Sequence, residues 1–442
     1  MMKTDTNNKL TILGFPGWMF LFMAIVLFFL GKTDMLLGGM VGALGYAMVV
    51  GTLLGWIGNK IPVWKTWFGG GMLFTSLATA AFATYGLIGV KTLKNLNAFN
   101  GSMGFLNLYI LVLITGSVLS IDRKMLIRSF AGYIPTILGG VVLSMLFCGA
   151  VGAVTGIGFV ESMMDFAIPV MGGGNGAGIT PMSKMWAAAK GLGDEAASQW
   201  WASAFATISL GNLCAVFMSA LLNKLGQVKP SLTGNGQLMR SADNDKAAVN
   251  LDEVEIGAGD YATGLALGLF CFAIATFYGK HISFINRAGL GFKIHEFAFM
   301  VILIAILNIS DILPVQVRAG ARGMQLFFVK YMSFPLMITV GVGSKLTDYA
   351  KVFTNPANFL CIIATVLGAM LGTYIVGNFF HFYPVEGMLT AGLCMANGGG
   401  SGDVQCLGAA NRMDMMSYAQ ISSRIGGAIM LVIASYFFGR YV

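Results

Sequence analysis

Long apolar runs separated by short polar segments make up most of the chain. A helix needs about 20 mostly apolar residues to cross a bilayer, so windows of that length without unpaired charge predict spans. Eleven windows emerge, of which the eighth is short: Phe15–Leu30, Met35–Ile57, Trp67–Gly89, Met103–Ser120, Tyr133–Gly158, Trp200–Asn223, Tyr261–Gly279, Phe297–Ile309, Gly323–Gly343, Phe359–Phe382 and Tyr418–Phe438. The pattern predicts an all-α integral membrane protein with eleven transmembrane helices.

Two further apolar stretches are broken by glycine near their middle. Residues 166–185 contain the run MGGGNGAG at 171–178, and residues 388–413 contain NGGGSGD at 397–403. Backbone without regular hydrogen bonds persists at membrane depth only where protein or a watery cavity surrounds it. Both stretches are therefore predicted to be re-entrant hairpins.

A polar, glycine-containing segment with a charged run divides the chain into two halves. The predicted parts are an N-terminal segment with the first helix (1–30), a first repeat (31–223), a linker (224–260) and a second repeat (261–442). Each repeat holds five spans, with a hairpin before the last one. Because five crossings are an odd number, the second repeat enters the membrane upside down, and the repeats are inverted.

Basic residues in two loops predict the orientation. They are Arg123, Lys124 and Arg128 after the fourth span, and Lys224, Lys229, Arg240 and Lys246 in the linker. Since basic loops stay inside, the N-terminus is predicted to be cytoplasmic and the C-terminus to lie outside. The first hairpin would then enter from outside and the second from inside. The first apolar stretch shows no small-residue cleavage pattern, so no removable signal peptide is predicted.

Composition narrows the functional class. Charged residues make up 10% of the chain and hydrophobic residues 56%, whereas soluble proteins carry roughly 25% charge. This excludes a cytosolic enzyme, a nucleic-acid binder and a disordered chain. The net charge of +8 is spread over short loops and is interpreted as a topology signal. The six cysteines and three histidines share no short spacing, so no cofactor, disulfide framework or transition-metal site is predicted.

The two glycine runs are the strongest functional signal. Glycine lets backbone approach a ligand closely and leaves amide and carbonyl groups free to bind ions. A single run would favour the simpler interpretation of close helix packing. Two broken segments in corresponding places of two halves instead indicate the midplane binding site of a transporter.

Arg424 lies just inside the last predicted span, where an unsatisfied cation costs about 3 kcal/mol or more. It either pairs with Asp403 or Asp414, or holds a substrate carboxylate in a bidentate fork, and the scarcity of acids favours the fork. Asp403 itself either binds a cation or caps the helix that follows. Lys330 interrupts the ninth span and is interpreted as a snorkelling side chain rather than an anion ligand.

Three motifs resemble those of the 2-hydroxycarboxylate transporter family. They are residues 171–178, the segment AGLCMANGGGSGD at 391–403 and the segment YAQISSRIGG at 418–427. The resemblance implies a bacterial inner-membrane homodimer with eleven spans and two inverted repeats. A transport domain in such a protein moves like an elevator against a dimerisation domain.

The same resemblance implies a substrate site at both hairpin tips and the last span, with sodium beside it. The implied substrate-binding residues are Asn175, Gly176, Gly400, Ser401 and Arg424. The implied sodium ligands are Val170, Gly173, Cys394, Met395, Asn397 and Ser423, many of them through backbone carbonyls. The side chain at Val170 departs from the family, which matters little if only its carbonyl binds.

By the same resemblance, Gly398 stands where citrate-transporting members of the family carry an arginine. Without that arginine one carboxylate of a tricarboxylate loses a charge-assisted bond worth about 1.5–3 kcal/mol. We therefore predict a dicarboxylate such as malate, taken up with sodium. Proton coupling, exchange of malate for lactate, citrate as the main substrate and a channel remain alternatives. An intramembrane enzyme would need a nucleophile with a base or clustered metal ligands, which the scattered Cys and His residues do not supply.

Overall fold

The computed structural model describes residues 11–62, 70–120, 132–240, 251, 254–283, 286, 295–343, 346–347, 354–412 and 415–442. Within these ranges the regular secondary structure is helical apart from a short antiparallel pairing of β1 (Thr11–Ile12) with β2 (Phe15–Pro16) and an isolated bridge between Met239 and Phe382. The chain forms two compact units. The first comprises residues 1–109, 192–202 and 326–350, and the second comprises 110–191, 203–325 and 351–442.

In the described part of the chain, eight helical stretches are long and apolar enough to cross a membrane. They are Gly39–Lys60, Val90–Leu119, Tyr133–Thr155, Asp194–Val228, Ala258–Ile282, Val315–Gly343, Pro356–Phe379 and Tyr418–Tyr441. Three shorter apolar helices, Gly17–Lys32, Gly70–Thr84 and Glu296–Ser310, overlap the first, third and eighth predicted windows. The all-helical membrane architecture is confirmed, and the count of eleven crossings stays a prediction.

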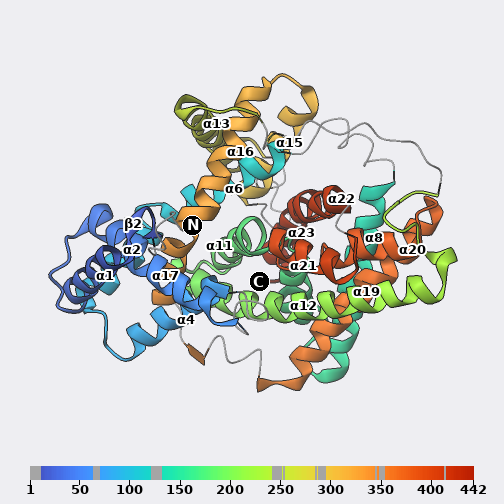
Figure 1. Ribbon diagram of the computed structural model, residues 1–442, viewed down its shortest axis with the longest axis horizontal. Coiled ribbons are helices and arrows are strands. Elements are labelled where there is room, and N and C mark those ends of the chain that lie inside the picture. Colours follow the sequence, from blue (N-terminus) through green and yellow to red (C-terminus); the bar gives the residue numbers. More distant parts are fainter. Residues whose placement is uncertain are drawn as a thin grey trace. The chain divides into compact units, whose positions relative to one another are not determined.

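The first unit is built around close helix contacts at glycine. Its elements are α1 (Gly17–Lys32), α2 (Gly39–Lys60), α4 (Gly70–Thr84), α5 (Val90–Asn100), η6 (Phe328–Met332) and α17 (Ser333–Gly343), with parts of α6 (Phe105–Leu119) and α12 (Asp194–Val228). Helices α2, α4 and α17 lie together although α17 is far away in sequence (Figure 1). A Cβ atom on Gly71 would lie 2.2 Å from the carbonyl oxygen of Gly55, so these two backbones are in direct contact.

The second unit contains most of the remaining helices. These are α8 (Tyr133–Thr155), η3 (Pro230–Leu232), α13 (Ala258–Phe277), η5 (Tyr278–Ile282), α15 (Glu296–Ser310), α16 (Val315–Phe327), α19 (Pro356–Phe379), α22 (Met416–Ile421), η9 (Ser422–Gly426) and α23 (Gly427–Tyr441). Helix α8 packs along α19 (Figure 1). A Cβ on Gly372 would lie 2.1 Å from the carbonyl oxygen of Gly139, and one on Gly368 would lie 2.5 Å from that of Leu143. Only glycine permits this approach.

Both glycine runs interrupt helices, as predicted, and both hairpins belong to the second unit. The first hairpin consists of α9 (Phe159–Ser162), η1 (Met163–Ala167), α10 (Ile168–Val170), a tip at 171–174, η2 (Asn175–Ile179) and α11 (Thr180–Ala189). The second consists of α20 (Pro384–Gly387), η7 (Met388–Leu393), a tip at 394–399 and α21 (Gly400–Ala409). Their re-entry from opposite sides of a membrane stays a prediction.

Three segments differ from the sequence prediction. Helix α12 runs from Asp194 to Val228, beyond both ends of its predicted window and into the predicted linker. Residues 230–240 of that linker are only partly solvated, because Thr233 and Leu238 are buried and the segment lies against the base of the second hairpin. Helix α5 precedes the fourth window and was not predicted, since its lysines and asparagines lower its mean hydropathy.

Some predictions fall on residues outside the described ranges. These are the start of the third window and the residues Arg123, Lys124, Arg128, Lys246 and Asp414. The predicted orientation and the predicted pairing of Arg424 with Asp414 therefore stay predictions.

Candidate functional site

The tips of the two hairpins touch through glycine backbone. A Cβ on Gly174 would lie 3.0 Å from the Cα of Gly399, and a Cβ on Gly399 would lie 3.1 Å from the carbonyl oxygen of Gly173. Gly174 has φ +115° and Gly399 has φ +77°, conformations that L side chains rarely adopt. The junction therefore requires glycine for both its space and its backbone geometry.

The last helix packs against both tips through the π-helical turn η9. A Cβ on Gly173 would lie 2.2 Å from the carbonyl oxygen of Ser423, and one on Gly426 would lie 2.3 Å from the sulfur of Met395. Single π-helical turns inside α-helices are frequent at functional sites. Two broken helices and one π-turn thus converge at one place, which a 20-residue hydropathy window does not reveal.

A buried cluster rich in oxygen lies at this junction. The Asp403 carboxylate is fully buried and accepts a hydrogen bond from Asn397 Nδ2 at 3.1 Å. Ser423 Oγ lies 2.9 and 2.8 Å from the two Asp403 oxygens, 3.1 Å from the Cys394 carbonyl oxygen and 3.2 Å from that of Ala419.

One hydroxyl proton cannot satisfy four acceptors. Around Ser423 the acceptor oxygens therefore outnumber the hydroxyl proton, and one of the groups is a carboxylate. Small hard cations prefer such oxygen ligands. No group of three or more His, Cys, Asp or Glu side chains suited to a metal occurs in the described ranges. The cluster therefore fits an alkali cation held by carbonyl, hydroxyl and carboxylate oxygens better than a transition metal.

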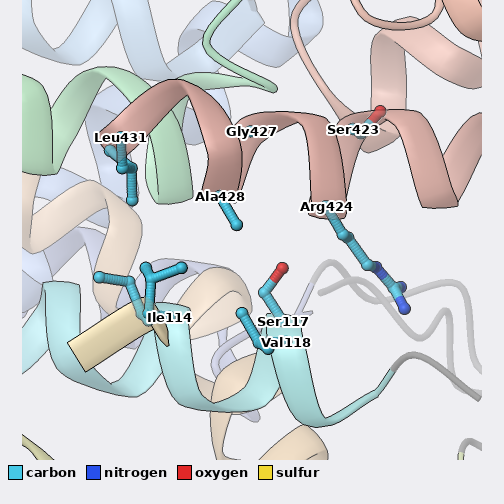
Figure 2. Close-up of a pocket in the computed structure, with 9 residues that line it drawn as sticks. Ile114, Ser117, Val118, Ser423, Arg424, Gly427, Ala428 and Leu431 are labelled. Carbon is cyan, nitrogen blue, oxygen red and sulfur yellow. The ribbon is translucent and has the colours of Figure 1, made fainter. Parts of the chain in front are cut away.

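Arg424 is the next residue along η9 and points to the opposite side. Its Nη1 donates a hydrogen bond to Ser120 Oγ at 2.7 Å, directly after α6. Figure 2 shows the arginine extending towards the end of α6 that carries Ser117 and Val118, whereas Ser423 points away from it. The crevice between them has a volume of about 10 Å³, room for about one water. In this conformation the guanidinium bonds to a protein hydroxyl.

The end of α6 is itself fixed by two polar side chains. Asn308 Nδ2 donates to the Val118 carbonyl oxygen at 3.0 Å, and Arg318 Nε donates to the Leu119 carbonyl oxygen at 3.2 Å. Carbonyl groups in the last turn of a helix lack partners within the helix. Because α15 and α16 supply those partners, Ser120 is presented to Arg424 from a fixed position.

The second tip is also held by α12. The Gly398 N–H donates to Asn212 Oδ1 at 3.2 Å, and Asn212 Nδ2 donates to Gln405 Oε1 at 2.8 Å. A Cβ on Gly398 would meet nothing closer than 3.7 Å, in contrast to the crowded Gly399 beside it. Position 398 therefore has room for a Cβ atom without displacing its neighbours.

The structure brings together several of the residues implied by the resemblance. Gly173, Cys394, Asn397 and Ser423 surround the oxygen cluster, and Met395 contacts the same π-turn. Val170 is fully buried at the end of α10, where its side chain packs against α12.

The other predicted residues lie close by in the chain. Gly176 and Gly400 lie in the first turn after each tip, where Asn175 and Ser401 also stand, although the side chains of these last two are outside the described part. Asp403 lies in the first turn of α21 rather than at its N-cap, and its carboxylate bonds with Asn397 and Ser423, while cation binding by Asp403 stays a prediction. Lys330 is exposed beside the ring of Tyr331, and its snorkelling interpretation stays a prediction.

Two contacts of the site were missed from the sequence. Asn212 could have been recognised from the sequence, because it is an amide within the apolar stretch of α12. Nothing in the sequence marks Ser120 as a site residue, since a serine at the end of a span is common and its partner is 304 positions away.

Known proteins resemble the chain over nearly its whole length. Residues 12–436 match the 2-hydroxycarboxylate transporter family. The citrate/sodium symporter of Salmonella typhimurium is 38% identical over 98% of this chain and 96% of its own length, and that of Klebsiella pneumoniae is 38% identical over 98% and 95%. The malate transporter MleP of Lactococcus lactis is 29% identical over 98% of both chains.

Proposed function

The chain belongs to the 2-hydroxycarboxylate transporter family, and we propose that it is a sodium-coupled symporter of a 2-hydroxycarboxylate in the bacterial inner membrane. It is a multi-pass membrane transporter and not an enzyme. The observation that carries the proposal is the adjacency of Ser423 and Arg424 on η9. One residue faces a cluster suited to a cation and the next presents a guanidinium suited to an anion, so binding of the two ions is coupled through one turn of helix.

The proposed sodium site uses the oxygens around Ser423. Val170, Gly173, Cys394, Met395, Asn397 and Ser423 are the proposed ligands, and Asp403 contributes its negative charge. A sodium ion there would be shared between both hairpin tips and η9, so it would hold the three elements together. This ordering is the physical reason why the anion site would form fully only with sodium bound.

The proposed substrate site lies at the same junction. Asn175, Gly176, Gly400 and Ser401 are the proposed hydrogen-bonding residues, and Arg424 is the proposed carboxylate ligand. Arg424 would exchange its bond to Ser120 for a bidentate pair with the substrate. That exchange would release the last helix from the end of α6, which links substrate binding to movement.

We propose malate rather than citrate as the preferred substrate. The relatives at 38% identity are named for citrate and a relative at 29% identity is named for malate, so overall similarity favours citrate. The proposal for malate rests on Gly398, which offers no cation to a third carboxylate. Citrate as the main substrate is the alternative.

Proton coupling or exchange is a second candidate because of Asp403. A fully buried carboxylate can be neutralised by a proton as well as by sodium. A symporter that uses protons, or an exchanger of malate for lactate, would use the same junction.

The rest of the proposed architecture is that of the family. We propose eleven spans in two inverted repeats, a homodimer, and an elevator movement of the part that carries the hairpins. The N-terminus would be cytoplasmic and the C-terminus periplasmic. The order of elements supports the repeat. The first half has α8, the first hairpin and α12, and the second half has α19, the second hairpin and α22–α23 in the corresponding places.

Uptake of radiolabelled malate and citrate into proteoliposomes tests the function. Each substrate is offered with an inward sodium gradient and with potassium in its place. Malate accumulation that requires sodium supports the proposal. A preference for citrate would overturn the proposed specificity for malate and leave the proposed sodium symport standing. Uptake driven by an inward proton gradient, or only from vesicles preloaded with lactate, would favour the second candidate.

A further inference from the structure

The base of the second hairpin contains a buried carboxylate that takes no part in the proposed site. Glu386 in α20 is fully buried. Thr233 Oγ1 donates to its Oε1 at 2.6 Å, and the Gly234 N–H donates to its Oε2 at 2.9 Å. Both donors come from the segment that follows α12. Both oxygens of this buried carboxylate therefore have hydrogen-bond donors, as buried polar groups in folded proteins require.

Arg412 completes the group from the other end of the hairpin. Its Nε lies 3.1 Å from Glu386 Oε1, and its side chain is only 10% exposed. Its Nη2 donates to Thr233 Oγ1 at 3.2 Å and to Asn235 Oδ1 at 3.0 Å. Since Glu386 begins the first arm and Arg412 follows the second, the ion pair joins the two arms at their base.

Residues 230–240, here called the strap, also pair with the chain that leads into the hairpin. The Tyr383 N–H donates to the Leu238 carbonyl oxygen at 2.8 Å, and the Arg240 N–H donates to that of His381 at 3.1 Å. Met239 and Phe382 thereby face each other as an antiparallel bridge. The strap is thus attached by backbone pairing as well as by the ion pair.

Base and tip of this hairpin are held by contacts of different kinds. Removing one partner of a buried ion pair is strongly destabilising, because the other charge is left uncompensated. The tip instead meets the first hairpin through glycine backbone contacts, α12 through Asn212 and η9 through Ser423. Opening at the tip would break these contacts without separating an ion pair, whereas opening at the base would separate Glu386 from Arg412.

We propose that Glu386 and Arg412 are positioning residues for the second hairpin, and that the strap stays bound to its base throughout transport. The tip then opens and closes on ligand while the base, the strap and the end of α12 move as one body. This inference rests on the proposed function, in which the tip holds substrate and sodium.

A disulfide between strap and hairpin tests the permanence of the contact. The flanking bonds make Met239 and Phe382 a non-hydrogen-bonded antiparallel pair, with Cα atoms expected about 4.5 Å apart, within the range that a disulfide spans. The double variant Met239→Cys/Phe382→Cys is oxidised with copper phenanthroline in proteoliposomes, and cross-linking is verified by mass spectrometry. Each single variant and the oxidised wild type are controls.

We expect the cross-linked protein to take up malate within about twofold of the same protein after reduction. Uptake that is lost on oxidation and restored by dithiothreitol would show that the strap must detach, and would overturn the proposal. If the wild type itself takes up neither malate nor citrate, the proposed function fails instead. The two failures are therefore distinguishable.

The positioning role is tested separately with Glu386→Gln. We expect the Michaelis constants for malate and sodium to rise about tenfold, with the maximal rate changed much less, because a displaced base misplaces the tip. Adding Arg412→Gln removes the uncompensated charge and should recover most of the loss. Glu255→Gln, an exposed carboxylate further along the same linker, is the matched control. Equal losses in Glu386→Gln and Glu255→Gln would contradict the assignment. So would a double variant, Glu386→Gln with Arg412→Gln, that recovers nothing.

Discussion

Arg424 Nη1 donates to Ser120 Oγ at 2.7 Å and so joins the last helix to the end of α6. Val118 and Leu119, the two residues before Ser120, are fixed through their carbonyl groups by Asn308 and Arg318. One N–H donor of the guanidinium proposed to bind substrate is therefore already bonded to a well-placed protein hydroxyl. A substrate carboxylate that takes Nη1 has to compete with that hydroxyl.

Replacement of Ser120 by alanine should make this competition easier. We expect the Michaelis constant for malate to fall about threefold to tenfold, because a hydrogen bond to a charged group contributes about 1.5–3 kcal/mol and water will recover part of it. Initial uptake rates across a range of malate concentrations give the value. Ser117→Ala, one turn earlier in α6 and lining the same crevice, is the control. An increased Michaelis constant in Ser120→Ala would mean that Ser120 orients Arg424 instead of competing with substrate.

Arg424→Lys keeps the positive charge and removes the planar fork. Since the paired bonds of a guanidinium to a carboxylate are lost, we expect the Michaelis constant for malate to rise at least about tenfold. Uptake kinetics at saturating sodium measure it. Unchanged kinetics would assign Arg424 a purely structural role.

Asp403→Asn removes the negative charge from the oxygen cluster while nearly keeping the side-chain shape. We expect the sodium concentration for half-maximal uptake to rise at least about tenfold, because a neutral amide attracts a cation far less than a carboxylate does. Sodium activation curves at fixed malate provide the test. Asp260→Asn, in the exposed cap of α13, controls for loss of a carboxylate elsewhere. A sodium curve like that of the wild type would remove Asp403 from the cation site.

Two neighbouring glycines should respond differently to alanine. At Gly399 the positive φ costs a side chain about 1–3 kcal/mol, and the new Cβ would crowd the first tip. We expect Gly399→Ala to lower both the melting temperature and uptake. Gly398→Ala should stay near the wild type, because its Cβ has 3.7 Å of clearance. Equal sensitivity at both positions would contradict the described tip geometry.

Gly398→Arg is expected to shift the preference towards citrate. A new guanidinium can pair with a third carboxylate, and a charge-assisted bond of about 1.5–3 kcal/mol corresponds to roughly tenfold to a hundredfold in relative affinity. Competition of unlabelled citrate against labelled malate measures the change, with Gly398→Ala as the variant without charge. Equal citrate inhibition in both variants would show that position 398 does not determine specificity.

Local features of the chain were predictable from sequence. Helices occur at every predicted window, because the requirement for internal hydrogen bonds in lipid leaves few alternatives. The breaks at Gly173–Gly174 and Gly398–Gly399 were predictable because a run of glycines disfavours a regular helix. Irregular backbone at membrane depth must then be surrounded by protein or a watery cavity.

Long-range pairing was not predictable in the same way. Arg424 was conspicuous as a cation inside a span, but its partner Ser120 is an ordinary residue that meets it only through the packing of α6 against η9. Glu386 and Arg412 were not singled out as partners in the sequence, and the strap residue Thr233 belonged to a segment predicted to be solvated. A hydropathy window reports the surroundings of one segment, whereas these contacts depend on which segments meet.

The contact of α8 with α19 has a consequence for biogenesis. The backbone surfaces at Gly139 and Gly372 pack against each other, yet α8 leaves the ribosome about 220 residues before α19. At ordinary rates of synthesis α8 therefore remains in the membrane for roughly 10–40 s before its partner arrives. During that interval the nascent first half carries an uncovered glycine face, which lipid or the insertion machinery has to cover until the second half is made.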